Sequence, residues 1–169
     1  MKNKLWYFSL YVLITIIAWS CEKEKVPVDS TEFPEVIAFG RFVTPGCFGN
    51  EACVELFRMD ASSLREDVND VSPVAGEWYN GNYATTLSKE DHVSIEQMLR
   101  NNIPQGLLQK ENGFVGTSPS WNTQYFYFEY KTASRHSYWV IDGSFDGNLG
   151  QELTTFINTL SVAVNTASF

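Results

Sequence analysis

QYFYFEYK at residues 124–131 and HSYWVID at residues 136–142 are the two stretches that decide the fold. Both are rich in aromatic residues and are bounded by turn-forming residues, a composition typical of β-strands. Residues 132–135, which separate them, are few enough for a hairpin turn. The sequence therefore predicts a pair of antiparallel strands here.

Both faces of this predicted hairpin carry apolar side chains. In the first strand, Phe126, Phe128 and Tyr130 share one face, and Tyr125, Tyr127 and Glu129 share the other. A sheet with one face open to water shows apolar residues on the opposite face only. We therefore expect both faces of the sheet to be covered at least in part.

A long closing helix is predicted from an apolar stripe near the C-terminus. Its members recur at steps of three and four residues, and they are Leu149, Leu153, Phe156, Ile157, Leu160 and Val164. Asp146 or Asn148 is expected to cap its first turn. This helix is expected to pack across the sheet.

Two further strands are predicted nearer the N-terminus. Val36–Val43 and Cys53–Asp60 are apolar-rich and are expected to form a hairpin. Ser62–Val68 fits either a strand or a short helix, and the Asn80-Gly81 pair predicts a turn.

A middle helix is predicted from Ser88 onward, with Ser88 as its cap and Asp91 at the reciprocal capping position. Leu107 and Leu108 are expected in a further short turn, and Glu111–Asn122 is expected to be a loop. Strands, a middle helix, a hairpin and a closing helix predict an α+β domain. Its sheet is expected to be mostly antiparallel, with the long C-terminal helix and one or two shorter helices on it.

The N-terminus is typical of a secretory signal. Two lysines lie within Met1–Lys4, and Leu5–Ile17 is an apolar stretch followed by the small residues Ala18 and Ser20. As a helix this stretch would span about 20 Å, less than the hydrocarbon core of about 30 Å. Residues 1–20 are therefore expected to be a signal peptide.

Cys21 directly follows this segment, at the place where the lipobox of bacterial lipoproteins carries its lipidated cysteine. The resemblance implies that Cys21 bears a diacylglycerol and becomes the first residue of the mature chain. The alternative is ordinary signal cleavage with Cys21 incidental. Residues 21–34, with two prolines and mixed charges, are expected to be a flexible linker. Residues 35–169 are expected to be a single globular domain.

Cys47 and Cys53 then remain as a pair in an exported chain. Nearby cysteines in an oxidising compartment usually bond, so a disulfide is the favoured interpretation. A zinc site is the weaker alternative because four ligands are the norm and only His92 and His136 could add to the pair. A redox pair is weaker still because the spacing is not that of a C-x-x-C motif.

The charge of the chain argues against nucleic acid as a partner. Residues 1–20 hold two lysines and no acid, so 10 basic and 20 acidic residues remain in the mature chain, a net charge of −10. Such a chain repels phosphate backbones. The expected partners are the membrane, through the lipid anchor, and an envelope protein or glycan.

The sequence contains no complete catalytic motif, phosphate loop or metal-binding motif of a familiar kind, and no cofactor or metal is expected. His92 and His136 are expected at the surface. Asp142 ends a predicted strand and fits either a general acid or, more simply, a turn cap. Glu129 lies among aromatic residues of the first hairpin strand, where it is expected to be buried.

The aromatic residues have two interpretations. They are Trp78, Tyr79, Tyr83, Trp121, Tyr125, Tyr127, Tyr138 and Trp139. They fill the core on both sides of the sheet, or part of the set forms an exposed platform for a sugar or a protein. Trp121, Tyr125, Tyr127 and Tyr138 are the predicted ligand contacts, and Trp121 is the one most expected to be exposed.

Three features together resemble small lipoproteins of the Bacteroidota type. They are the lipobox-like start, the Cys47–Cys53 segment and Trp139-Val-Ile-Asp142 before the closing helix. Families of this kind have no established function. The resemblance implies a place in the cell envelope, at the outer membrane and facing the periplasm or the surface. It assigns no catalytic residue.

A non-catalytic binding or accessory module on a lipid anchor is therefore the leading hypothesis. The alternative is a small envelope hydrolase or enzyme inhibitor with a site near Asp142, Glu129 or His136.

Overall fold

The computed structural model describes residues 34–44, 53–69, 71–116, 123–143 and 150–168. Its strands are β1 (Val36–Thr44), β2 (Val54–Asp60), β3 (Leu64–Asp67), β4 (Tyr83–Thr86), β5 (Gly113–Val115), β6 (Thr123–Lys131) and β7 (His136–Asp142). Its helices are α2 (Lys89–Asn102), α3 (Gln105–Leu108) and α4 (Gln151–Ala167).

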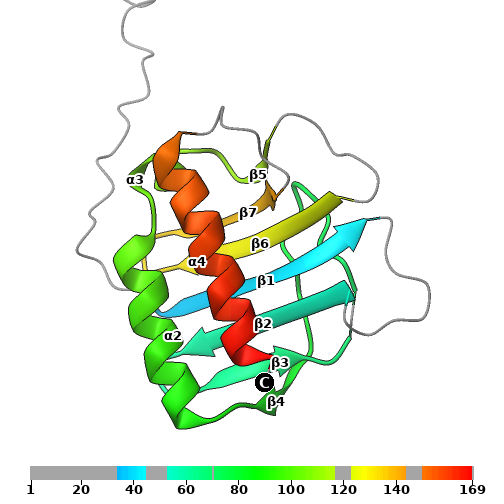
Figure 1. Ribbon diagram of the computed structural model, residues 1–169, viewed down its shortest axis with the longest axis vertical. Helices are drawn as coiled ribbons and strands as arrows, with labels where there is room; N and C mark the ends of the chain where they lie inside the picture. Colours follow the sequence, from blue (N-terminus) through cyan, green and yellow to red (C-terminus); the bar gives the residue numbers. More distant parts are fainter. Residues whose placement is uncertain (1–33, 45–52, 70, 117–122, 144–149, 169) are drawn as a thin grey trace, which may run out of the picture.

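The strands form one seven-stranded sheet in the order β4-β3-β2-β1-β6-β7-β5. Neighbouring strands are antiparallel except β5 and β7, which are parallel. The helices lie on one face of the sheet, with α4 crossing the strands beside α2 (Figure 1). The predicted α+β class with a mostly antiparallel sheet and a long C-terminal helix is confirmed.

The two predicted hairpins lie next to each other at the centre of the sheet. β1 pairs with β2 on one side and with β6 on the other, so Phe39 stands opposite both Phe57 and Phe128. The rings of Phe39 and Phe57 stack with their centroids 5.5 Å apart. β6 and β7 form the second hairpin, as predicted from the sequence.

The face of the sheet under the helices holds the larger apolar core. Phe128 is fully buried there, with its ring 4.9 Å from that of Phe156 on α4 and 6.1 Å from that of Trp139 on β7. The predicted stripe of α4 supplies Leu153, Phe156, Ile157, Leu160 and Val164 to this core, and its first member, Leu149, lies outside the described residues. Periodicity alone therefore identified the buried side of this helix correctly.

Some boundaries differ from the predictions. Ser62–Val68, left open between strand and helix, contains strand β3. Glu111–Asn122, predicted as a loop, contains β5, whose three residues are too few to show an alternating pattern. The N-cap of α4 is Gly150, with φ 80° and no side-chain cap bond. Asp146 and Asn148, the predicted caps, lie outside the described residues.

The start of α2 confirms one prediction and contradicts another. Ser88 is its N-cap and accepts a hydrogen bond from the Asp91 backbone N–H at 3.1 Å. His92, expected at the surface, is instead buried, and its Nε2 lies 2.9 Å from the backbone oxygen of Asp60. His92 precedes Ile95 by three residues, so it shares the buried side of the helix.

Candidate functional site

The face of the sheet opposite the helices, called here the far face, carries a second and smaller apolar cluster. Its buried members are Ala38, Phe42, Val54, Leu56, Tyr125, Tyr127 and Val140. Residues 68–82, which connect β3 to β4, contact this face; we call them the strap, of which residue 70 lies outside the described part. The strap thus covers the part of the far face around Tyr127, where Tyr79 packs against the cluster.

Glu129 is a buried carboxylate at the centre of the far face. Strand alternation places it on the same side as Tyr127 and opposite Tyr138 of β7. Only 1% of Glu129 is exposed. Its Oε1 lies 2.9 Å from Nε2 of His136, and its Oε2 accepts a hydrogen bond from the Tyr127 hydroxyl at 3.3 Å. These two partners satisfy a group whose burial would otherwise be costly.

His136 lies between this carboxylate and the surface, with 31% of its side chain exposed. The ring of Trp78, from the strap, meets the His136 ring edge-on at 5.1 Å. The ring of Tyr138, also on β7, lies with its centroid 5.9 Å from that of the His136 ring. The Tyr138 hydroxyl also donates to the backbone oxygen of Gly76, at 3.5 Å. His136 therefore contacts the buried Glu129 through its Nε2 and the strap through the ring of Trp78.

Asp67, at the end of β3, is the second buried carboxylate of the far face. It accepts hydrogen bonds from the Tyr79 hydroxyl and from the backbone N–H of Asn82. The backbone N–H of Tyr79 donates to the Tyr127 hydroxyl at 3.4 Å. A continuous chain of contacts thus runs from Asp67 through the strap to Tyr127 and Glu129.

Gly81 lies in the predicted Asn-Gly turn, which the structure shows as irregular chain against Asp67. A Cβ atom at Gly81 would lie 2.9 Å from Asp67 Oδ1 and 2.7 Å from the Tyr79 ring. Any side chain at this position would displace one of these two groups. The glycine is therefore required by a close approach of the strap to its anchor.

Two tyrosines of this face are held in the neutral state. Burial, and after it the negative charge of Glu129, raises the pKa of both Tyr83 and Tyr127 well above the ordinary value for tyrosine. Neutral Tyr127 keeps the proton that it donates to Glu129. The buried Tyr83 hydroxyl has no hydrogen-bond partner among the described residues, and Arg58 lies 5.6 Å from the centre of its ring.

The structure brings together some of the predicted site residues and separates others. Glu129 and His136 are in direct contact. Asp142 is buried at the other end of β7, six residues from His136 and therefore about 20 Å from it at the usual rise of a strand. Tyr125 and Tyr127 are core residues with 2% and 0% exposure, whereas Tyr138 is half-buried.

Other predicted positions fall outside the described residues. They are Cys21, Cys47 and Trp121. Cys53 immediately precedes β2 and is half-buried. The Cys47–Cys53 disulfide and the exposure of Trp121 therefore stay predictions.

The strap and its anchor Asp67 were missed by the sequence reasoning. Residues 68–82 have no periodicity, so they gave no sign of covering a sheet face. One local clue existed, because Asp67 ends the short charged stretch Leu64–Asp67 and the predicted Asn80-Gly81 turn follows in the same part of the chain. Which carboxylate would meet which hydroxyl depends on the strand order, which the sequence did not reveal.

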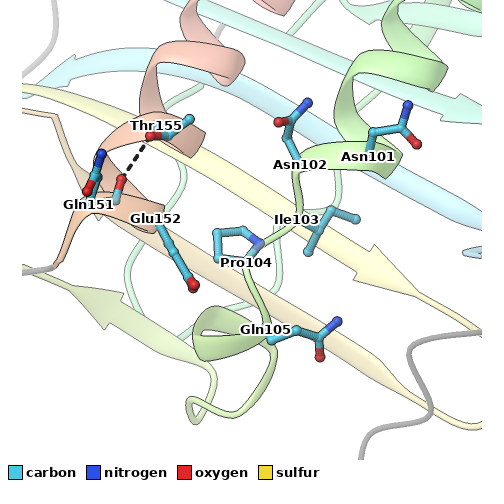
Figure 2. Close-up of a pocket in the computed structure, with 8 residues that line it drawn as sticks. All are labelled: Asn101, Asn102, Ile103, Pro104, Gln105, Gln151, Glu152 and Thr155. Carbon is cyan, nitrogen blue, oxygen red and sulfur yellow. Dashed lines mark hydrogen bonds between the residues drawn. The ribbon is translucent and has the colours of Figure 1, made fainter.

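A separate groove of about 470 Å³ lies on the helix side (Figure 2). It is lined by Asn101, Asn102, Ile103, Pro104, Gln105, Gln151, Glu152 and Thr155. These residues come from the end of α2, the start of α3 and the first turns of α4. The groove contains none of the residues that were predicted as a site.

Within the described ranges, no group of three or more His, Cys, Asp and Glu side chains could hold a metal ion. Among the helices in that same part of the chain, none combines the length and the apolar character needed to cross a bilayer. Comparison with protein-family models, with curated proteins and with solved structures finds no match to this chain.

Proposed function

We propose that this chain is a lipid-anchored protein of the cell envelope that acts as a non-catalytic binding or accessory module. In this proposal residues 1–20 are a cleaved signal, Cys21 carries the lipid, and residues 21–34 tether the α+β domain to the outer membrane. The domain faces the periplasm or the cell surface and binds an envelope component there.

The observation that carries the binding role is that the far face buries its tyrosines but exposes a tryptophan on the strap. Tyr125 and Tyr127, which a stacking ligand would need, are both buried: Tyr127 lies under Tyr79 of the strap, and Tyr125 packs against Phe42 and Phe114. Trp78, which lies on the strap, is 46% exposed. Tryptophan is enriched among the residues that anchor protein interfaces, and the strap that carries Trp78 is fixed by hydrogen bonds to Asp67 and Tyr127.

A hydrolase with a site at Glu129 and His136 is the second candidate. It is favoured by the 2.9 Å contact between them, since a carboxylate that orients a histidine is a common device of general base catalysis. In the structure, however, the His136 ring is flanked by Trp78 and Tyr138, and Glu129 is closed off from solvent. This arrangement supports a structural role for the pair better than a catalytic one.

Photo-crosslinking in the producing cells tests the binding role. A photoreactive residue is placed at Val74 on the strap or, as the matched control, at Val162 on α4; the wild-type valines are 58% and 50% exposed. We expect a discrete crosslinked product from position 74 that is absent at position 162. Equal products from both positions, or none from either, would contradict a binding role for this face.

The lipid anchor has its own test. Metabolic labelling with a palmitate analogue is expected to mark the wild-type protein and not the Cys21→Ala variant. Equal labelling of the two proteins would exclude Cys21 as the lipidated residue.

The proposed disulfide is tested by mass mapping without reductant. We expect Cys47 and Cys53 in one linked peptide, closing a loop that stabilises the β1–β2 connection by about 2–3 kcal/mol. Two free thiols in exported protein would contradict this pairing.

A further inference from the structure

The strap concentrates the exposed apolar side chains of the described part of the chain. The described residues include six large hydrophobic side chains that are exposed. Four of the six lie within eleven consecutive positions of the strap: Val68, Val71, Val74 and Trp78. The other two, Val93 and Val162, stand singly on α2 and α4. Single exposed residues are normal on a protein surface, whereas a run of four on one segment is typical of an interaction surface.

The chain around this run is acidic. Between Arg65 and Lys89 the sequence contains four acidic residues and neither lysine nor arginine. Glu77 is exposed and Glu66 is half-buried, whereas Asp67 is buried and hydrogen-bonded and Asp70 lies outside the described residues. Arg65 itself lies 3.5 Å from the Asp60 carboxylate. The whole chain has a formal net charge of −8. A partner with basic residues would therefore be attracted to the strap, and a second copy of this acidic chain would be repelled.

The strap is also held in place before any partner arrives. The backbone N–H of Tyr79 is bonded to Tyr127, and that of Asn82 is bonded to Asp67. Trp78 rests against His136, and the backbone oxygen of Gly76 accepts from Tyr138. A segment fixed in this way loses little conformational entropy on binding, which favours affinity.

We propose that the strap is the docking surface for a basic protein segment that also carries apolar side chains, such as an amphipathic helix or strand rich in lysine or arginine. This inference rests on the proposed binding function and names the chemistry of the partner. The valines and Trp78 would contact the apolar side chains of that segment. Glu77, which is exposed, would face its cations.

The test uses the mature chain, with Cys21→Ser to keep it in solution, and a short amphipathic peptide of lysine and leucine. Amide chemical shifts are followed during the titration. We expect shifts in residues 68–82 and a dissociation constant that the V71S/V74S double variant raises about tenfold. The V93S/V162S double variant, which also removes two exposed valines, is expected to bind as the wild type does.

Three results with the purified chain would overturn the inference. The first is equal weakening by the two double variants, and the second is equally tight binding of a lysine–serine peptide, since both would mean that only diffuse charge is involved. The third is self-association of the chain through residues 68–82. A crosslinked partner at Val74 that is acidic or is a glycan would overturn this inference alone, because the binding function would then stand. Absence of any crosslinked partner would contradict the binding function itself.

Discussion

The two faces of the sheet are covered through different kinds of interaction: apolar contacts on one face and mainly hydrogen bonds on the other. The helix-covered face is closed by α2 and α4 through apolar contacts such as that of Phe128 with Phe156. The far face is closed by the strap, which is fixed by hydrogen bonds to Asp67 and Tyr127. The first face therefore owes its closure mainly to burial, whereas the second owes it to a few polar contacts that can be removed one at a time.

This difference separates stability from recognition within one small domain. Side chains on the helix side are close-packed, and their loss leaves cavities. On the far face, the apolar cluster lies beside the hydrogen-bonded pair Glu129 and His136 and packs against Tyr79 of the strap. Variants on the two faces are therefore expected to differ in size of effect and in what they disturb.

The largest expected effect lies on the helix-covered face. Replacing Phe128 by Ala removes a fully buried ring between Trp139 and Phe156 and should lower the free energy of unfolding by about 3–5 kcal/mol. Denaturant unfolding of the variant measures this loss, and Phe128→Leu serves as the milder control. A loss of less than about 1 kcal/mol would mean that this face is not a close-packed core.

A smaller loss is expected at the centre of the far face. Glu129→Ala leaves His136 and Tyr127 without their shared acceptor and should cost about 2 kcal/mol of unfolding free energy. Glu129→Gln keeps an acceptor and should cost less. If the two substitutions destabilise equally, the hydrogen bonds to Glu129 contribute nothing beyond the shape of the side chain.

The two faces also differ in how far the sequence predicted them. The stripe of α4 and the alternation of β6 depend only on spacing along the chain, so both were predicted correctly. The contact between Glu129 and His136 depends on a hairpin register that was predicted only in outline. The strap was missed, because its bonds to Asp67 and Tyr127 join residues that are brought together only by the order of the strands.

Alkaline pH should weaken the far face in particular. The pKa of Tyr83 and of Tyr127 is raised in the folded state, so both stay neutral while the unfolded chain ionises above pH of about 10. Their contribution to stability is therefore present below that pH and is lost as the pH rises. At one pH unit higher the loss is about 1.4 kcal/mol for each tyrosine, and thermal unfolding measured across this range would reveal it. A flat profile would mean that these hydroxyls are not buried.

The smallest expected effect distinguishes two hydroxyls of the same face. Tyr83→Phe removes a buried hydroxyl that has no partner among the described residues, so stability should stay the same or rise by up to about 1 kcal/mol. Tyr79→Phe removes the hydroxyl that donates to Asp67 and should cost about 1 kcal/mol. Thermal unfolding of the two variants in parallel gives the comparison. The reverse order of stability would contradict the assignment of partners on this face.

The central claim is that the strap is fixed to the far face by Asp67 and Tyr127, and amide hydrogen exchange tests it most directly. The amides of Tyr79 and Asn82 donate to these side chains, so they should exchange slowly in the wild type. In the Asp67→Ala variant they should exchange much faster, while the amides of α4 keep their protection. Exchange of the wild-type strap amides at the rate of an unstructured peptide would contradict the account.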